Sequence, residues 1–408
     1  MMPDYEETLE FLYSRLPVFQ HIGAAAYKAD LNNTIALCDA LQNPHHHFKS
    51  IHVGGTNGKG SVSSMLAAIF MKHGYKTGLY TSPHLKDFRE RIRINGNMIP
   101  KDFVVSFTES MKPMIEKIYP SFFELTVGMA FAYFKQSAVD IAIIEVGMGG
   151  RLDSTNVISP ELSVITNIGW DHMEFLGDTL AKIASEKAGI IKKNVPAVIG
   201  EVLPETLSVF EQTAKNRTSE LTRGVNAPAR WIEKCALKGD YQKKNLGTVK
   251  AAIQALERQG YHFSEHLILE ALQEVKQLTG LRGRWEIMQE QPLIIADTAH
   301  NADGLVETMG QLTKGLKGKL HMVMGVVKEK DLAKILKLLP ASAEYYYCKP
   351  AIFRGLDAEI LAAEATKAGL QGKVFGSVEQ ALMAAKDAAQ KNDTIYIGGS
   401  TFVVAEVL

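Results

Sequence analysis

Short apolar runs alternate with helical patterns through the first part of the chain. The apolar runs start at Ser50 and recur at residues 76–80, 139–146 and 162–168, and helical patterns at residues 61–73 and 123–134 lie between them. Strands of a parallel sheet read as near-continuous apolar runs because helices cover both faces of such a sheet. The pattern therefore predicts an α/β fold with a mainly parallel sheet, preceded by helices at residues 5–16 and 31–41.

The pattern changes near Leu281. Four further apolar runs, separated by helical patterns, lie at residues 293–296, 321–326, 344–348 and 394–397. A chain of 408 residues also exceeds the usual size of a single hydrophobic core. We therefore predict a larger α/β domain over residues 1–286 and a smaller one over residues 287–408, with a hinge near residues 284–291.

The first apolar run leads into a glycine-dense turn, formed by Gly55, Thr56, Asn57, Gly58, Lys59, Gly60 and Ser61. Glycines let backbone N–H groups converge on an anion, the following helix adds its positive end, a lysine supplies a cation, and a serine hydroxyl can bind magnesium. The spacing departs from the common Walker pattern because Gly60 separates Lys59 from Ser61. A nucleotide phosphate loop is the favoured interpretation, and a plain glycine turn of an α/β protein is the alternative.

Two more loops with chemically active side chains follow predicted strands. The run at residues 139–146 leads through Glu145 into a glycine-rich loop, and the run at residues 162–168 leads to His172. Ligands of parallel α/β sheets bind at the carboxyl ends of the strands. We therefore expect these loops and the glycine-dense turn to meet.

Three arginines, Arg89, Arg91 and Arg93, alternate with other residues before Asn95 and Gly96. This arrangement predicts one arm of a hairpin around a tight turn. The residues alone leave open whether these arginines form a solvated strand face.

Composition excludes several classes of partner. Lys and Arg number 45 and Asp and Glu number 45, so we expect neither nucleic acid nor an anionic membrane as a partner. No apolar run approaches the ~18 residues of a membrane span, and the first residues lack the pattern of a signal peptide. The three cysteines are widely spaced, which favours a reducing cytoplasm over a disulfide framework.

The order of motifs along nearly the whole chain resembles that of the folylpolyglutamate synthase and dihydrofolate synthase family, relatives of the Mur ligases. The two signature segments are residues 55–61 and residues 144–153. Further matching segments are residues 81–85, 122–124, 170–172, 185–190, 241–245, 283–285, 297–301 and 398–400. The resemblance implies a P-loop ATP-binding domain followed by a smaller Rossmann-like domain, and we expect a monomer. It also implies that the hairpin with the three arginines is a flap on the substrate side.

The resemblance also implies roles for individual residues. Lys59 would contact phosphate, Ser61, Glu145 and His172 would serve two Mg²⁺ sites, and Lys187 would be carbamylated to give an anionic oxygen ligand. The expected ATP contacts are Gly55, Thr56, Asn57, Gly58, Lys59, Gly60, Ser61, Asn245, Arg284 and Asp297. The expected contacts with the other substrates are Ser82, Pro83, Phe123, Glu124, Leu152, Asp153, Ser154 and His300. Without the resemblance, His172 could be structural, Lys187 a surface residue of a last helical turn, and Asp297 a helix cap.

These parts suit transfer of the γ-phosphate of ATP to a carboxylate, followed by attack of an amine on the acyl phosphate. The resemblance implies L-glutamate as the amine and a folate glutamate tail or dihydropteroate as the acid. Residues 23–31 depart from the segment that many family members carry there, which leaves open whether dihydropteroate fits. The alternatives are a Mur-type ligase acting on a UDP-linked peptidoglycan precursor and a non-catalytic ATP-binding regulator.

Overall fold

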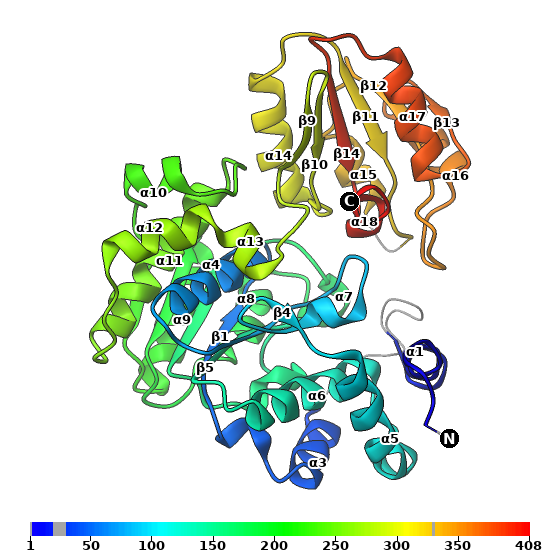
Figure 1. Ribbon diagram of the computed structural model, residues 1–408. Coiled ribbons are helices and arrows are strands. Elements are labelled where there is room, and N and C mark those ends of the chain that lie inside the picture. The colour runs from blue at the N-terminus through cyan, green and yellow to red at the C-terminus, as the bar shows by residue number, and fades with distance from the viewer. Residues whose placement is uncertain (1, 19–29, 329–330) are drawn as a thin grey trace. The chain divides into compact units, whose positions relative to one another are not determined.

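A computed structural model describes residues 2–18, 30–328 and 331–408. The chain forms two compact units (Figure 1). The larger unit comprises Met1–Ala236 and Lys243–Leu281, and the smaller unit comprises Leu237–Gln242 and Arg282–Leu408. The short segment Leu237–Gln242 therefore belongs to the smaller unit, although the stretches on both sides of it belong to the larger one. The functional boundary between residues 286 and 287 stays a prediction.

An eight-stranded sheet organises the larger unit, in the order β4-β3-β2-β5-β1-β6-β7-β8. Six of these strands run parallel, namely β2, β5, β1, β6, β7 and β8. Strands β3 and β4 form an antiparallel hairpin at the edge next to β2. The strands are β1 (Lys49–Gly54), β2 (Thr77–Tyr80), β3 (Ile92–Ile94), β4 (Asn97–Met98), β5 (Ile141–Glu145), β6 (Leu162–Asn167), β7 (Ala197–Glu201) and β8 (Leu221–Arg223). The predicted parallel sheet is confirmed, and so is the hairpin around Asn95 and Gly96. Of the three arginines predicted on its first arm, only Arg93 lies in the strand, because Arg89 and Arg91 form a 3₁₀ turn before it.

Helices cover this sheet (Figure 1). They are α1 (Tyr5–Arg15), α3 (Asn32–Ala40), α4 (Lys59–Lys72), α5 (Lys101–Ile118), α6 (Phe122–Gln136), α7 (Met173–Leu176), α8 (Leu180–Ala188), α9 (Pro204–Asn216), α10 (Ala229–Lys234), α11 (Gln242–Glu257), α12 (Glu265–Gln273) and α13 (Val275–Thr279). Short 3₁₀ turns lie at η2 (Pro44–His46), η3 (Phe88–Arg91) and η4 (Ser154–Val157). Among the described residues, no helix is both long enough and apolar enough to cross a lipid bilayer.

Helix α4, which carries the end of the glycine-dense turn, is buried on all sides. Every residue from Gly60 to Phe70 is buried. The helix packs against β1, β2 and β5 and also against α12 and α13. A helix that is buried all round belongs to a core rather than to a surface. The first turn of α4 is therefore held in place by packing along the whole helix.

A six-stranded sheet organises the smaller unit, in the order β13-β12-β11-β14-β10-β9. All pairs are parallel except β9 with β10. The strands are β9 (Glu286–Glu290), β10 (Leu293–Ala296), β11 (Leu320–Met324), β12 (Glu344–Tyr347), β13 (Gly372–Val374) and β14 (Thr394–Gly398), and the helices are α14 (Ala302–Lys314), α15 (Leu332–Leu336), α16 (Ala358–Lys367), α17 (Val378–Ala388) and α18 (Thr401–Val407). The predicted second α/β unit is confirmed, with β9 and β13 as additional edge strands.

Candidate active site

The glycine-dense turn connects the end of β1 to the start of α4, as the sequence predicts. Gly55 has φ of +136° and Gly58 has φ of +85°, values that L side chains rarely adopt. A Cβ atom on Gly55 would lie 2.0 Å from Oγ1 of Thr166, and one on Gly58 would lie 2.3 Å from Oδ1 of Asn245. Both glycines are therefore required by backbone conformation and by space.

The end of β6 fixes the backbone of this turn. The N–H of Thr56 donates to the carbonyl oxygen of Asn167 at 3.0 Å, and the N–H of Asn57 donates to the Oδ1 of Asn167 at 2.8 Å. The hydroxyl of Thr56 accepts from the N–H of Gly169 at 3.0 Å. The first N–H groups of a helix have no carbonyl partner within the helix, so the first turn of α4, which includes Lys59, Gly60 and Ser61, directs donors at an incoming anion.

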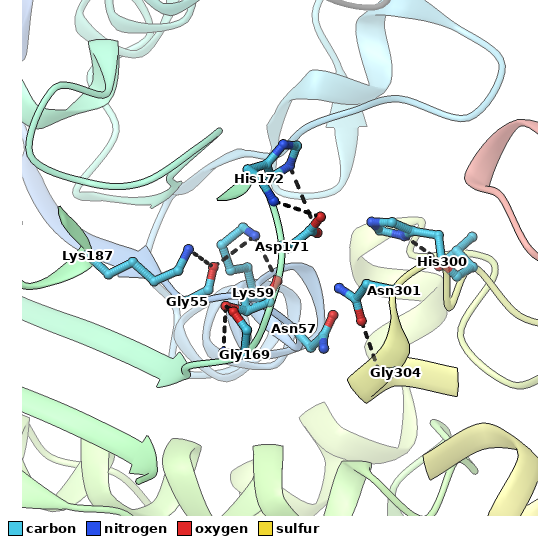
Figure 2. Close-up of polar contacts among 12 residues, drawn as sticks. Gly55, Asn57, Lys59, Gly169, Asp171, His172, Lys187, His300, Asn301 and Gly304 are labelled. Carbon is cyan, nitrogen blue, oxygen red and sulfur yellow. Dashed lines mark hydrogen bonds and ion pairs between the residues drawn. The ribbon is translucent and has the colours of Figure 1, made fainter. Parts of the chain in front are cut away.

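Two lysines point at one carbonyl oxygen of the turn (Figure 2). Lys59 Nζ donates to the carbonyl oxygen of Gly55 at 3.1 Å and to that of Thr56 at 3.2 Å. Lys187 Nζ donates to the same Gly55 oxygen at 2.9 Å. Burial, together with the nearby charge of Lys59, lowers the pKa of Lys187 to about 7. Lys187 is therefore a buried amine beside the phosphate loop, rather than a solvated cation at a helix end.

Glu145 lies at the strand end next to the phosphate loop. It is the last residue of β5, pairs in register with Val53 of β1, and is 4% exposed. One carboxylate oxygen accepts the N–H of Ser82 at 3.2 Å. Ser61, in the first turn of α4, is also buried. Two of the expected metal ligands therefore come from adjacent strand ends of the larger unit.

His172 follows β6, on the other side of β1. Its N–H donates to Asp171 Oδ1 at 3.0 Å, and its Nε2 lies 3.9 Å from Asp171 Oδ2 (Figure 2). Strands β5, β1 and β6 are neighbours and run parallel, so the three predicted loops leave the sheet side by side, at the carboxyl ends of these strands. Within the residues that the structure describes, no group of three or more His, Cys, Asp or Glu side chains is arranged to hold a metal ion.

Asp153 organises the second glycine-rich loop. Its Oδ1 accepts the N–H of Thr155 at 3.0 Å and the Thr155 hydroxyl at 2.5 Å, and its Oδ2 accepts the N–H of Met148 at 2.8 Å. Burial raises the pKa of this carboxyl above its usual value. Of the two residues next to it, Leu152 is half-buried and Ser154 is the first residue of η4. Both oxygens of Asp153 thus have structural partners, and its expected contact with substrate stays a prediction.

Phe123 and Glu124 open helix α6. A Cβ on Gly147 would lie 2.4 Å from Cζ of Phe123, so the phenyl ring lies directly against the second glycine-rich loop. Glu124 Oε2 accepts the N–H of Ser121, and the Ser121 hydroxyl accepts the N–H of Glu124, which is a capping box. Glu124 therefore has a structural role at the helix start that the sequence analysis missed, although the serine three residues before it was a signal.

Ser82 and Pro83 follow β2 and are joined by a cis peptide bond. Ser82 is half-buried and contacts Glu145 through its N–H, whereas Pro83 is exposed. These two residues therefore lie one strand beyond Glu145, because β2 and β5 are neighbours.

Asp297 is the centre of a hydrogen-bond network in the smaller unit. Its Oδ2 accepts the Tyr241 hydroxyl at 2.7 Å and the N–H of Trp285 at 2.6 Å, and its Oδ1 accepts the N–H of Ala299 at 2.8 Å. Burial raises the pKa of Asp297, and the Tyr241 hydrogen bond opposes that shift. Asp297 is thus more than the helix cap considered above, since it ties the segment around Tyr241 to the end of β10.

The remaining expected site residues lie in two places. Arg284 Nη1 donates to the Thr298 hydroxyl, and His300 Nδ1 lies 2.9 Å from the Thr298 carbonyl oxygen, both in the smaller unit. Asn245 is in the larger unit, on α11, with its amide against Gly58 of the phosphate loop. The structure thus brings Arg284 and Asp297 into one unit and Asn245 to the phosphate loop, and their contacts with ATP stay predictions.

Comparison with known protein families gives two matches. Residues 53–267 match the Mur ligase middle domain, and residues 283–401 match the Mur ligase glutamate ligase domain. A probable bifunctional folylpolyglutamate synthase/dihydropteroate synthase of Haloferax volcanii is 33% identical over 433 residues, covering 99% of this chain and 50% of that protein. This chain therefore spans about half the length of that relative. A dihydrofolate synthase/folylpolyglutamate synthase of Escherichia coli K12 is 35% identical over 371 residues, covering 87% of this chain and 85% of that protein.

Solved structures agree with the sequence relatives. E. coli FolC in complex with DHPP and ADP has a TM-score of 0.85 and 30% sequence identity, covering 99% of this chain and 97% of that chain. A bifunctional folylpolyglutamate synthase/dihydrofolate synthase of Yersinia pestis, complexed with AMPPNP and Mn ion, has a TM-score of 0.82 and 27% identity, with coverage of 99% and 97%. Together with the phosphate loop and the adjacent Glu145, these matches establish that the chain belongs to the folylpolyglutamate synthase and dihydrofolate synthase family of the Mur ligase superfamily.

Proposed function

We propose that this chain is an ATP-dependent ligase that adds L-glutamate to the glutamate tail of folates and to dihydropteroate, releasing ADP and phosphate. The observation that carries the proposal is the phosphate loop, with Lys59 and Lys187 at the Gly55 carbonyl and Glu145 at the neighbouring strand end. Relatives with this activity in their names are similar over most of the chain. The dihydropteroate synthase activity in the name of the Haloferax relative is not proposed here, since this chain covers half of that protein.

The reaction has two steps. An oxygen of the substrate carboxylate attacks the γ-phosphorus of ATP, the bond from that phosphorus to the β-phosphate oxygen breaks, and ADP leaves. The amine of L-glutamate then attacks the acyl carbon, phosphate leaves with the C–O electron pair, and the nitrogen loses a proton. Most of the rate in such reactions comes from positioning and from neutralising charge on the phosphoryl group. The residues suited to this are Lys59 and the first-turn N–H groups of α4.

ATP and a divalent metal ion fit the residues at this edge of the sheet. Ser61 and Glu145 offer oxygen donors and His172 a ring nitrogen, a donor set that suits Mg²⁺ or Mn²⁺ when phosphate oxygens complete the coordination. We propose these residues as the protein ligands of two metal sites. The metal would neutralise negative charge on the phosphates during transfer.

We further propose that Lys187 reacts with CO₂. A buried lysine whose pKa is about 7 is substantially neutral at physiological pH, and a neutral amine can attack CO₂ to give a carbamate and a proton. The product replaces a cation by an anion next to the phosphate loop, where a metal ligand is expected. Incubation with ¹³C-bicarbonate should give one carbamate signal in the NMR spectrum that is absent from Lys187→Arg. A wild-type spectrum without that signal would refute the modification.

The pterin side of the substrate would lie against Phe123 and the loop organised by Asp153. Residues 23–31, where the sequence departs from many family members, lie mostly outside the described part of the chain. The case for dihydropteroate therefore rests on Phe123, the adjacent loop and the relatives named dihydrofolate synthase.

The two alternatives from the sequence are set aside. The relatives are folylpolyglutamate and dihydrofolate synthases, so the chain is not a Mur-type ligase acting on a UDP-linked peptidoglycan precursor. It is also an enzyme rather than a non-catalytic ATP-binding regulator. The monomeric state, the cytoplasmic location and the absence of nucleic-acid and membrane partners stay predictions.

Release of ADP, measured with each acid substrate and with or without L-glutamate, tests the proposal. We expect glutamate-dependent ADP release with tetrahydrofolate and with dihydropteroate, and product one glutamate heavier by mass spectrometry. Nucleotide binding without turnover on any acid would contradict it.

A further inference from the structure

Arg91 is an almost fully buried arginine in the hairpin flap of the larger unit. It ends η3, immediately before β3, and is 3% exposed. Its Nε donates to Nδ1 of His84 at 2.8 Å, and its guanidinium lies 5.3 Å from the centre of the Phe122 ring. The sequence left open whether this arginine lines a solvated strand face, and its burial excludes that possibility.

No acidic side chain in the described part of the chain forms an ion pair with Arg91. Within the described ranges, no carboxylate oxygen comes within 4.0 Å of its guanidinium nitrogens. Nearby acids have other partners: Asp87 pairs with Arg89, and Glu90 accepts the N–H groups of Leu85 and Asp87. A buried charge without a counter-charge is costly, so it normally has a partner of opposite sign. Arg91 is therefore suited to an anion that comes from outside the chain.

A second buried polar group lies beside it. The hydroxyl of Tyr80 is buried, and its polar neighbour is the guanidinium of Arg91. Burial lowers the pKa of Arg91, and the phenols of Tyr80 and Tyr13 lie close to its guanidinium. Two or more N–H donors of a guanidinium can bind a carboxylate in parallel, and a phenol O–H can add a further bond. The combination is suited to a carboxylate.

The position of Arg91 along the sheet edge indicates which carboxylate. Its carbonyl oxygen accepts the N–H of Thr81 at 3.0 Å, which places the Arg91 backbone beside the end of β2, on the side away from β5. Strand β5, with Glu145 at its end, lies between β2 and the phosphate-loop strand β1. Neighbouring strands are about 4.8 Å apart, so the Arg91 backbone lies two strand spacings from that of Glu145. The arginine side chain extends back far enough for the charge of Glu145 to act on its guanidinium. The two carboxyl carbons of glutamate, joined through four carbon–carbon bonds, are about 5 Å apart when extended. A glutamate with one carboxylate near Glu145 can therefore place the other near Arg91.

We propose that Arg91, with the Tyr80 hydroxyl, binds the α-carboxylate of the terminal glutamate of the folate substrate. The γ-carboxylate then faces the phosphate loop and is the one that receives the phosphoryl group. The inference rests on the proposed function and deepens it, because it explains how one site selects the γ-carboxylate. Dihydropteroate has a single carboxylate, so its reaction does not use Arg91.

The test compares three acids with wild type and Arg91→Gln. They are tetrahydropteroylglutamate, its analogue with 4-aminobutyrate in place of glutamate, which lacks only the α-carboxylate, and dihydropteroate. We expect wild type to prefer the glutamate form over the analogue by roughly 100-fold in kcat/KM, since a lost charge-assisted pair commonly costs that much or more. In Arg91→Gln the preference should fall to a few-fold, mainly through KM, while kcat/KM for the analogue and for dihydropteroate stays within a few-fold of wild type.

Arg89→Gln is the matched control, because this arginine lies two residues away and is already paired with Asp87. It should retain the preference for the glutamate form. Equal loss of all three activities in Arg91→Gln would mean a purely structural role and would overturn the proposal. The wild-type comparison needs no variant, and equal kcat/KM for the glutamate form and the analogue would also overturn it. Failure of the proposed function would look different, since wild type would then turn over none of the three acids.

Discussion

Lys59 and Lys187 donate hydrogen bonds to the same acceptor, the carbonyl oxygen of Gly55, at 3.1 and 2.9 Å. Two ammonium groups at one oxygen repel each other, and the charge of Lys59 is the second cause, after burial, of the lowered pKa of Lys187. An anion on the phosphate loop would relieve this repulsion. The phosphate loop therefore favours an anion electrostatically, and the properties of the two lysines depend on each other.

Lys59→Ala should reduce ADP formation by at least about 100-fold, because it removes a cation that stabilises the transferring phosphoryl group. The melting temperature should change little, because the Lys59 side chain, at the first residue of α4, is not part of the hydrophobic core. Lys72→Ala is the control at the other end of the same helix, where the lysine pairs with Glu274. Normal turnover in Lys59→Ala would remove the proposed role.

Lys187→Met should change how stability depends on pH. The folded pKa of about 7 lies below the ordinary value of 10.5, so between these pH values the unfolded chain binds more protons and folding is favoured as pH rises. This contribution amounts to at most about 1.4 kcal/mol per pH unit. In urea unfolding of the unmodified protein at low CO₂, wild type should gain stability relative to Lys187→Met from pH 7 to pH 10. Parallel pH profiles would show that the lysine is not perturbed.

Glu145→Gln should raise the Mg²⁺ concentration needed for half-maximal ADP release by roughly tenfold or more, because it replaces an anionic oxygen ligand by a neutral amide. Glu201→Gln is a suitable control, since Glu201 also ends a parallel strand of this sheet but pairs with Lys244. An unchanged metal titration would remove Glu145 from the ligand set.

Tyr241→Phe should destabilise the smaller unit by about 1–3 kcal/mol, because it removes a donor to the buried carboxylate of Asp297. In the variant the pKa of Asp297 should rise further, because its charged carboxylate loses a hydrogen-bond donor. The destabilisation caused by the substitution should therefore become smaller as the pH falls through that pKa and Asp297 is protonated. Tyr345→Phe removes a hydroxyl that donates to a neutral carbonyl, that of Pro340, and should show no such pH dependence. Identical pH profiles for the two variants would contradict this account.

The core strands were predictable from sequence because parallel strands covered on both faces are uniformly apolar, as in β5, where every residue is buried. Strand β9 was not, because most of its residues are exposed at the edge of the smaller sheet and form no apolar run. Segment Leu237–Gln242 was placed in the first domain by sequence, since nothing local reveals that Tyr241 bonds to a residue 56 positions away.

The phosphate loop was predictable because glycines mark positions whose backbone conformation other residues rarely adopt, as at Gly55 and Gly58. The structural partners of the site residues were not. Asn167 fixes the loop through its side chain, and Asp153 and Asp297 each accept several hydrogen bonds, yet a single Asn or Asp in a sequence gives no sign of its partners. The burial of Arg91 was hidden for the same reason, because an alternating pattern of arginines looks like a solvated face.

The smaller unit is built from two separate segments of the chain, and this has a practical consequence for preparing it as a fragment. A fragment that starts at Arg282 would lack Tyr241 and the contacts of Gln311 with the backbone of Lys238 and Asp240. Recombinant expression of the carboxy-terminal piece, or its exchange between homologues, therefore has to carry residues 237–242 along. The boundary of the smaller unit is thus set by its hydrogen bonds rather than by position along the chain, and a substitution at Asp297 should be matched by one at position 241.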